Sequence, residues 1–173
     1  STEPFLKFGE IGNRSSARTT NLLEAFQRAG VQAEIPPNID SAIWEKFMFI
    51  TAMSGVGALT RVPTGIWRSI PETWDMAVAI VKEAESVAMA LDIPMSGAES
   101  DAVISLIQRL QPNGTVSMQR DIMEGRPSEL EVQNGAIVRL GLTAGVPTPV
   151  NDFIYHSLLP QEKRARGEFE DIT

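Results

Sequence analysis

The chain contains no cysteine and only one histidine among its 173 residues. Without cysteine it can form neither a disulfide nor a thiolate nucleophile. The single histidine, His156, rules out a zinc motif built on several histidines. Its segment, FIYHSLLP, is typical of a late amphipathic helix in which the histidine is a surface or packing residue. We therefore expect no metal centre.

Long hydrophobic runs are also missing. The most apolar run, residues 47–59, falls short of the ~20 residues that span a bilayer and contains Gly55 and Gly57. The first residues have neither the basic start nor the apolar centre of a secretion signal. The net charge of −7 disfavours a nucleic-acid surface, which needs clustered lysine and arginine. These absences predict a protein that binds neither membranes nor nucleic acid, and the 43 % hydrophobic content predicts a substantial core.

The order of patterns predicts two unequal parts. Residues 5–10 and 31–35 resemble short strands, and a helical pattern lies between them. Two strands cannot form a stable sheet alone, so this β-α-β unit is expected to belong to a larger domain. Pro36 and Pro37 then interrupt the pattern, and everything after them has the periodicity of helices. The predicted fold is mainly α, with the β-α-β unit first, and the missing initiator methionine suggests a fragment.

A long apolar helix over residues 40–64 is the centre of the predicted helical part, and it carries one lysine, Lys46, near its start. Helical spacing places Ile50 and Ser54 on the same face as Lys46. In the ordinary interpretation, the lysine stem covers apolar surface while its ammonium stays in water. In the alternative, a lysine in a partly dry cleft has a lowered pKa and donates a proton to a developing alkoxide.

Capping patterns predict where the other helices begin and end. Glu129 is placed at the first position of a helix, where its carboxylate interacts favourably with the positive end of the helix dipole. Gly145 is expected to end that helix, and the last helix is expected to run to about residue 159, followed by a polar tail. The predicted caps and capping boxes are Asp40 or Ser41, Ser69 with Glu72, Ser117, Ser128 with Glu131, and Thr148 before Pro149.

Four segments in this order resemble the C-terminal part of ketopantoate reductase: FGEIGNRSSART with FQRAGV, then IWEKF, SMQRDIMEGRPSELEVQNG and GVPTPVND. The resemblance implies a Rossmann domain that binds NADPH, followed by a helical domain related to that of 6-phosphogluconate dehydrogenase. Residues 1–36 would be the end of the Rossmann domain and residues 37–173 the helical catalytic and substrate domain. It further implies a cytoplasmic enzyme of pantothenate biosynthesis whose NADPH is held mainly by a domain upstream of this chain.

The resemblance also implies roles for three residues. Lys46 matches the catalytic lysine that protonates the substrate ketone as hydride arrives. Glu129 matches the glutamate that contacts the cofactor, and Ser117 matches the serine that binds the substrate carboxylate. The match of Lys46 to the catalytic lysine of the family favours its role as a proton donor over the ordinary interpretation, in which its stem only covers apolar surface.

The chain departs from the family where substrate-binding asparagines are common. Those positions hold Ile50, Ser54 and Thr64 here. Isoleucine has no polar group, and serine and threonine restore only part of the capacity of an amide to form hydrogen bonds. Ser54 and Thr64 are thus the expected substrate-binding residues beside Ser117, and the substrate is expected to differ.

The sequence therefore predicts an NADPH-dependent reductase of a small 2-oxoacid, 2-dehydropantoate in the closest reading, with this fragment inactive alone. One alternative is a related reductase that takes a different 2-oxoacid. Another is a non-catalytic helical module for interaction or dimerisation. A homodimer is compatible with each of these readings.

Overall fold

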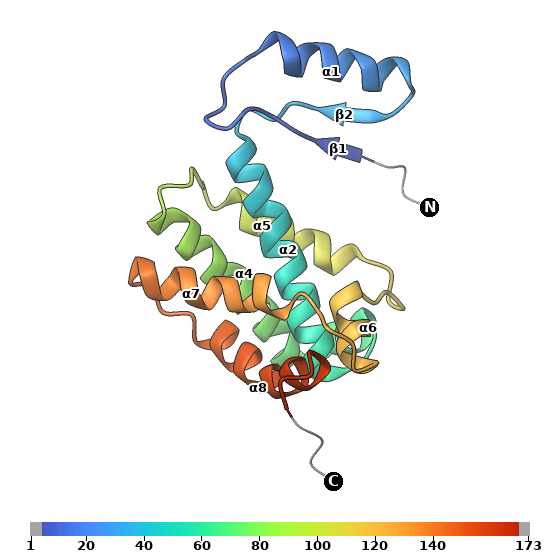
Figure 1. Cartoon of the computed structure of the whole chain (residues 1–173), viewed down its shortest axis with the longest axis vertical. Helices are drawn as coiled ribbons and strands as arrows, with labels where there is room; N and C mark the ends of the chain where they lie inside the picture. Colours follow the sequence, from blue (N-terminus) through green and yellow to red (C-terminus); the bar gives the residue numbers. More distant parts are fainter. Residues whose placement is uncertain (1–4, 170–173) are drawn as a thin grey trace.

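The computed structural model describes residues 5–169, which form a small β-α-β unit followed by a helical body (Figure 1). In the unit, β1 (Phe5–Lys7) pairs in parallel with β2 (Gln32–Glu34), and α1 (Ala17–Arg28) connects them. Ser16 caps α1 because its hydroxyl accepts a hydrogen bond from the amide of Thr19. The predicted β-α-β pattern is confirmed, although both strands are shorter than the sequence suggested.

The helical body is built around α2 (Ile39–Thr60). This helix packs against α4, α5, α6 and α8, and residues 51–58 are all buried. The mainly helical fold predicted from the sequence is thereby confirmed. The other elements of the body are α3 (Thr64–Arg68), α4 (Pro71–Ala90), α5 (Ala98–Arg109), α6 (Ser117–Met123), the 3-10 helix η1 (Leu130–Val132), α7 (Asn134–Ala144) and α8 (Pro149–Ala165).

Two glycines inside α2 allow its neighbours to come close. A Cβ added to Gly57 would lie 2.7 Å from Oε1 of Gln119 on α6. A Cβ added to Gly55 would lie 2.8 Å from Nδ2 of Asn134 on α7. Glycine normally weakens a helix, but here it removes the side chain that would hold two buried amide groups away. Packing thus explains the glycines that interrupt the apolar run.

Several helix starts differ from the sequence prediction. Asn38, rather than Asp40 or Ser41, caps α2, because Oδ1 of Asn38 accepts a hydrogen bond from the amide of Ser41 at 2.9 Å. The capping box predicted at Ser69 and Glu72 is wrong. Pro71 occupies the first turn of α4, and the residue before it, Ile70, makes no side-chain cap.

The last two helices confirm one prediction and correct another. Gly145 ends α7 in the left-handed conformation with φ 71°, and Pro149 opens α8, both as expected. However, α8 continues past Pro160 to Ala165, so the first part of the predicted polar tail is helical. Proline removes one backbone donor there and leaves the rest of the helix intact.

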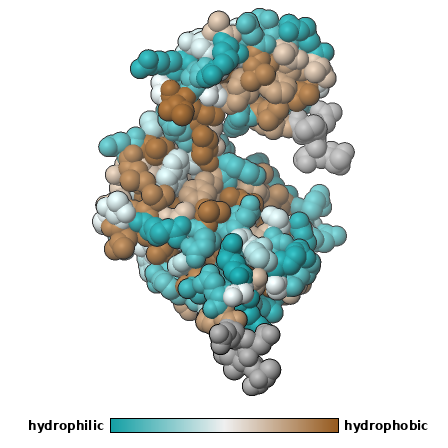
Figure 2. Space-filling view, viewed as in Figure 1, coloured by the Kyte–Doolittle hydropathy of each residue, from teal (hydrophilic) through white to brown (hydrophobic). Residues whose placement is uncertain are grey.

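Only a few contacts hold the β-α-β unit to the helical body. The amide of Ile39 donates to Oδ1 of Asn13 at 2.6 Å, and Gly9 lies against the side chain of Ile39. Lys7 forms an ion pair with Glu45 at 3.5 Å. Figure 2 shows the result, a narrow waist between the unit and the body where apolar residues reach the surface.

Candidate functional site

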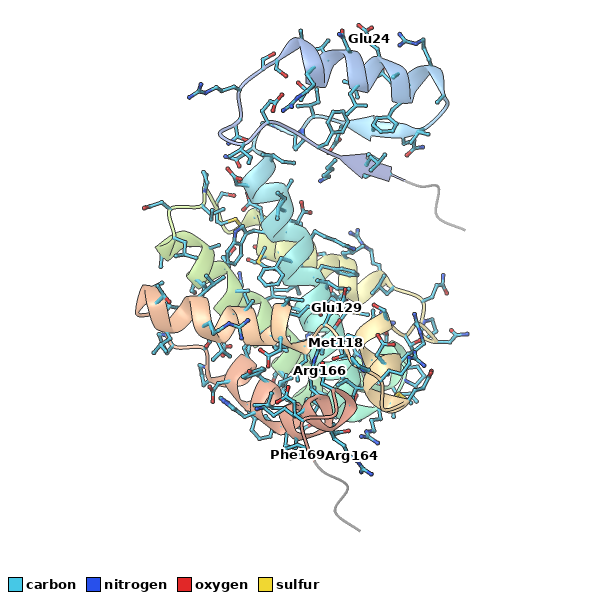
Figure 3. All side chains as sticks on the ribbon, viewed as in Figure 1. Glu24, Met118, Glu129, Arg164, Arg166 and Phe169 are labelled. Carbon is cyan, nitrogen blue, oxygen red and sulfur yellow. The ribbon has the colours of Figure 1, made fainter. Side chains whose placement is uncertain are left out.

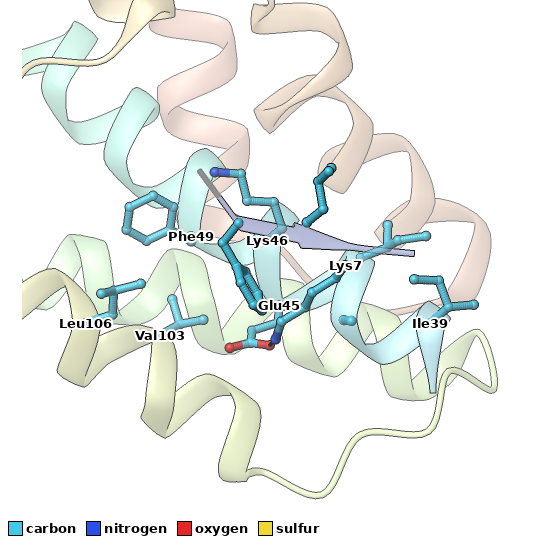
Figure 4. Close-up of a pocket in the computed structure, with 11 residues that line it drawn as sticks. Lys7, Ile39, Glu45, Lys46, Phe49, Val103 and Leu106 are labelled. Atoms are coloured by element: carbon cyan, nitrogen blue, oxygen red, sulfur yellow. Dashed lines mark hydrogen bonds and ion pairs between the residues drawn. The ribbon is translucent and has the colours of Figure 1, made fainter. Parts of the chain in front are cut away.

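A cavity of about 580 Å³ lies at this waist, between β1, α2 and α5. Its walls are mostly apolar, and Lys7, Glu45 and Lys46 are its polar residues. The close-up in Figure 4 shows Lys46 and Phe49 on α2 near Val103 and Leu106 of α5. The apolar lining residues are Phe5, Leu6, Ile39, Ala42, Ile43, Phe49, Val103 and Leu106. An apolar pocket with a few polar groups is typical of a small-molecule site.

Lys46 is the predicted site residue that lines this cavity. It is exposed, and its Nζ lies 5.2 Å from the centroid of the Phe49 ring, within range of a cation–π interaction. Within residues 5–169, no carboxylate pairs with Lys46 and no hydrogen bond holds it. The neighbouring Lys7, in contrast, pairs with both Glu34 and Glu45 at 3.5 Å. The Lys46 ammonium is therefore available to an anionic or carbonyl group in the cavity.

Ser54 lies two turns after Lys46 on α2, outside the residues that line the cavity. It is fully buried, and its hydroxyl has no hydrogen-bond partner among the described residues. Thr51, three residues earlier, is in the same state, and Ile50, the residue before Thr51, is half-buried. This part of α2 thus has two buried hydroxyls without partners beside an isoleucine.

Thr64 is bound to the loop that precedes α6, the helix that begins with Ser117. The amide and hydroxyl of Thr64 both donate to the carbonyl of Gly114, at 3.0 and 2.9 Å. Thr64 is buried, whereas Ser117, three residues after Gly114, is exposed. Ser117 is the first residue of α6, and the prediction that it caps this helix is wrong because Val116 occupies the cap position.

Glu129 lies on the loop between α6 and η1, near the centre of the view in Figure 3. Its side chain is exposed, and Oε2 accepts a hydrogen bond from Nε2 of Gln133 at 2.9 Å. Oε1 has no partner within the described part of the chain. Since a carboxylate only accepts hydrogen bonds when ionised, Oε1 is suited to a hydroxyl or amide of a ligand.

The capping box predicted around Glu129 is wrong. Glu131 bonds to Arg139 and Tyr155 instead of reaching back to Ser128. Glu129 was predicted at the first position of a helix. It lies instead directly before the 3-10 helix η1, and the longer helix α7 begins only at Asn134. Burial is the main cause that raises the pKa of Tyr155, and its hydrogen bond to Glu131 adds to this effect.

Of the five predicted site residues, Lys46 lines the cavity, whereas Ser54, Thr64, Ser117 and Glu129 lie on other parts of the body. Sequence reasoning missed Phe49 and the α5 residue Val103. Phe49 follows Lys46 by three positions, so helical spacing could have identified it. Val103 could not be found in this way, because only the packing of α5 brings it to the cavity.

Residues 5–169 contain neither a metal site nor a membrane-spanning helix. No group of three or more histidine, cysteine or acidic side chains is placed to hold a metal ion. None of the helices in that range is both long and apolar enough to cross a membrane.

Comparison with known proteins gives the family. Residues 38–162 match the model described as the C-terminal domain of ketopantoate reductase PanE/ApbA. The chain belongs to the ketopantoate reductase family. The sequence resemblance to this family is thereby confirmed, and the match covers most of the helical body.

The chain is similar to named members of the ketopantoate reductase family. It is 29 % identical over 151 residues to the 2-dehydropantoate 2-reductase of Archaeoglobus fulgidus, covering 86 % of this chain and 50 % of that protein. The solved 2-dehydropantoate 2-reductase of Methylococcus capsulatus is 27 % identical with a TM-score of 0.81, covering 92 % of this chain and 51 % of that one. This chain therefore spans about half the length of the relatives that it matches.

A third similar structure is that of D-mandelate dehydrogenase with NADH and anilino(oxo)acetate. It has a TM-score of 0.80 at 24 % identity, and covers 92 % of this chain and 52 % of that one. At this identity the likeness establishes a shared fold.

Proposed function

We propose that this chain is the substrate-binding part of an NADPH-dependent 2-oxoacid reductase. In this proposal residues 1–36 complete a nucleotide-binding domain, and residues 37–173 form the helical domain. The observation that carries the proposal is the position of Lys46, which lines the apolar cavity at the waist and, within residues 5–169, has no ion pair or hydrogen bond. Membership of the ketopantoate reductase family supports it.

The residues of this chain would hold the substrate and supply a proton. Lys46 would stabilise the negative charge that develops on the carbonyl oxygen of the substrate as hydride arrives, and would then donate a proton to that oxygen, which leaves the lysine neutral and the product a hydroxyl. Ser117 is exposed and can donate its hydroxyl to the carboxylate of the substrate. Ser54 and Thr64 are buried, so we propose that they shape the site beside Ile50, and their direct contact with substrate stays a prediction.

One residue of this chain, Glu129, is suited to contact a nicotinamide nucleotide. Glu129 has an open carboxylate oxygen that would accept a hydrogen bond from a hydroxyl or amide of the nucleotide. The bound nucleotide would supply the hydride. NADPH is the proposed form, and NADH is the alternative because the similar D-mandelate dehydrogenase was solved with NADH.

The proposed substrate class is a small 2-oxoacid. 2-Dehydropantoate is the first candidate, because the named relatives are 2-dehydropantoate 2-reductases. The apolar walls of the cavity, with Ile50 on the lysine face of α2, favour a 2-oxoacid that has an apolar side group. A screen of 2-oxoacids that follows NADPH absorbance would rank these candidates.

The decisive experiment replaces Lys46 with alanine in the full-length protein. We expect kcat to fall by about 10²- to 10⁴-fold, the range that general acid catalysis contributes. The matched control is Lys7→Ala, which removes a lysine that lines the same cavity but is already paired with two carboxylates. A change of KM alone in Lys46→Ala would remove Lys46 from the role of proton donor.

A second candidate function is a non-catalytic module for interaction or dimerisation. Leu142 on α7 is 84 % exposed and Phe153 on α8 is 58 % exposed, and these two helices pack against each other, so exposed apolar side chains on this helix pair favour a partner surface. Failure of the full-length protein to bind NADPH or NADH in a fluorescence titration would favour this function. Substitution of Leu142 and Phe153 by serine would then alter the oligomeric state.

A further inference from the structure

The segment that carries Glu129 is attached to the end of α8 by a buried carboxylate. Glu162 on α8 is 1 % exposed. Its two oxygens accept hydrogen bonds from the amide of Ser128 at 3.0 and 3.1 Å, and Oε2 also accepts one from the Ser128 hydroxyl at 2.5 Å. Three hydrogen bonds thus run from the residue immediately before Glu129 to one side chain that lies 34 positions later.

Arg166 completes this attachment from the other side. Its Nε donates to Glu162 at 2.7 Å, and its Nη2 donates to the carbonyl of Ser128 at 2.8 Å. Both main-chain polar groups of Ser128 and its hydroxyl are therefore bound to the end of α8, by Glu162 within the helix and by Arg166, the residue that caps it. The buried carboxylate of Glu162 is paired with Arg166 and hydrogen-bonded at both oxygens. Removing one of these partners would leave a buried polar group uncompensated, which costs stability.

Other contacts hold Glu129 from the side that follows it in the chain. Its carbonyl accepts hydrogen bonds from the amides of Val132 at 3.1 Å and Gln133 at 3.0 Å, and its Oε2 accepts one from Nε2 of Gln133 at 2.9 Å. Arg126 pairs with Asp121 at 2.7 Å, but both groups belong to the same short stretch, and Arg126 is exposed. On the far side of Glu129, Leu130 is fully buried in the core. Glu129 is thus exposed and held by η1, Gln133 and the packing of Leu130 on one side, while Glu162 holds the residue before it on the other.

We propose that Glu162 is a positioning residue that holds Glu129 at the nucleotide through Ser128. This inference rests on the proposed function, because it gives Glu129 a ligand to meet. In the proposed arrangement Glu129 contacts the nucleotide, and Glu162 contacts neither substrate nor nucleotide. Fixing the residue before Glu129 restricts the backbone from which its carboxylate extends, and displacement of a contact group by about 1 Å can lower a rate by about 100-fold.

The test compares Glu162→Ala with Glu83→Ala in the full-length protein. Glu83 is the matched control because its carboxylate holds the opposite end of α8, accepting hydrogen bonds from the amides of Val150 at 2.8 Å and Asn151 at 3.0 Å. We expect Glu162→Ala to weaken NADPH binding and to lower kcat/KM by about 10- to 100-fold. Amide hydrogen exchange should become faster in residues 126–129 as well. Glu83→Ala should speed exchange at the start of α8 and leave the Kd for NADPH unchanged.

Two further variants keep the result interpretable. Glu162→Gln preserves the shape of the side chain and should retain part of the affinity, while Ser128→Ala removes only one of the three hydrogen bonds to Glu162 and serves if Glu162→Ala does not fold. In a Glu129→Ala background, Glu162→Ala should change the Kd for NADPH little further, because the two residues act through one contact.

Three outcomes would overturn the inference. Faster exchange in residues 126–129 with unchanged NADPH affinity and kcat/KM would show that the attachment is structural only. Fully additive effects of Glu129→Ala and Glu162→Ala would show that they act independently. A silent Glu129→Ala variant would remove the nucleotide role of Glu129 itself, and this failure is distinguishable because it does not depend on position 162.

Discussion

The β-α-β unit and the helical body differ in how much of their apolar surface they cover. The body has a continuous core whose largest fully buried side chains include Trp67, Met48 and Ile80. In the unit, Thr19 is the buried residue among positions 5–35. Large apolar side chains there remain exposed, namely Phe5, Leu6, Ile11, Leu22 and Ile35. The difference indicates that the body is stable through its own packing, whereas the unit has faces suited to further structure.

The cavity lies where these two regions meet. Its walls come from β1 in the unit and from α2 and α5 in the body. Lys46 stands on the well-packed side, at the start of the most buried helix, so its backbone is held firmly while its side chain faces the more open unit. This placement supports the proposed role of Lys46, because a proton donor must be held in a fixed position relative to its substrate.

The largest stability difference should separate core positions of the two regions. Ile154 on α8 is fully buried, and Ile154→Ala should lower the free energy of unfolding by about 2–5 kcal/mol through lost packing and the cavity left behind. Leu22 on α1 is 42 % exposed, so Leu22→Ala should lower it by less than about 1.5 kcal/mol. Urea denaturation of both variants measures this. Equal losses would contradict the distinction between the two regions.

The sequence was sufficient for the helical architecture and insufficient for several helix starts. The apolar run of α2, the end of α7 at Gly145 and the start of α8 at Pro149 depend on local sequence, so pattern alone identified them. At the start of α2, Asn38, Asp40 and Ser41 are all good capping residues. In the structure Asn38 has the extended backbone conformation of a cap, and local sequence alone does not show which of the three residues adopts it.

The candidate site shows the same limit. Lys46 could be singled out because one charge in an apolar helix is unusual, and the family resemblance gave it a role. The rest of the cavity depends on α5, whose Val103 lies 57 positions after Lys46 and reaches the cavity through tertiary packing. The contact between Glu162 and Ser128 could not be predicted for the same reason, because the two residues are 34 positions apart and meet only through tertiary packing.

Glycine is required for different reasons in the two regions, which gives the second prediction. A Cβ on Gly65 in the body would lie 2.5 Å from Cβ and 2.8 Å from Cα of Pro112. Gly12 in the unit has open space around it but a φ of +78°. Gly65→Ala should therefore lower the free energy of unfolding by about 1–3 kcal/mol through steric overlap. Gly12→Ala should lower it by about 1–2 kcal/mol through backbone strain.

Asparagine separates the two causes, because it tolerates the left-handed conformation but not a steric overlap. Gly12→Asn should recover much of the stability lost in Gly12→Ala, while Gly65→Asn should be at least as unstable as Gly65→Ala. Thermal denaturation of the four variants measures both effects. Recovery of stability by asparagine at position 65 would show that the contact with Pro112 relaxes easily.

The smallest predicted effect compares one carboxylate from each region. In the unit, the hydrogen bond from Arg18 is the main cause that lowers the pKa of Glu10, and Ser16 adds to it. In the body, hydrogen bonds from the backbone, that of Ser96 first, lower the pKa of Glu99 at the start of α5. A lowered pKa in the folded state means that each group adds stability above its ordinary pKa of about 4.5, and this stability is lost as the pH falls through the lowered value.

Salt should distinguish these two carboxylates. Raising the ionic strength from about 0.1 M to about 1 M shortens the Debye length from about 10 Å to about 3 Å, which screens an exposed ion pair but leaves a backbone hydrogen bond largely intact. The pKa of Glu10 should therefore move up toward its ordinary value in high salt, while that of Glu99 should stay low. Carboxyl chemical shifts followed by NMR during a pH titration measure both values. If the pKa of Glu99 rose as much as that of Glu10, long-range charge and not local hydrogen bonding would be the cause in both regions.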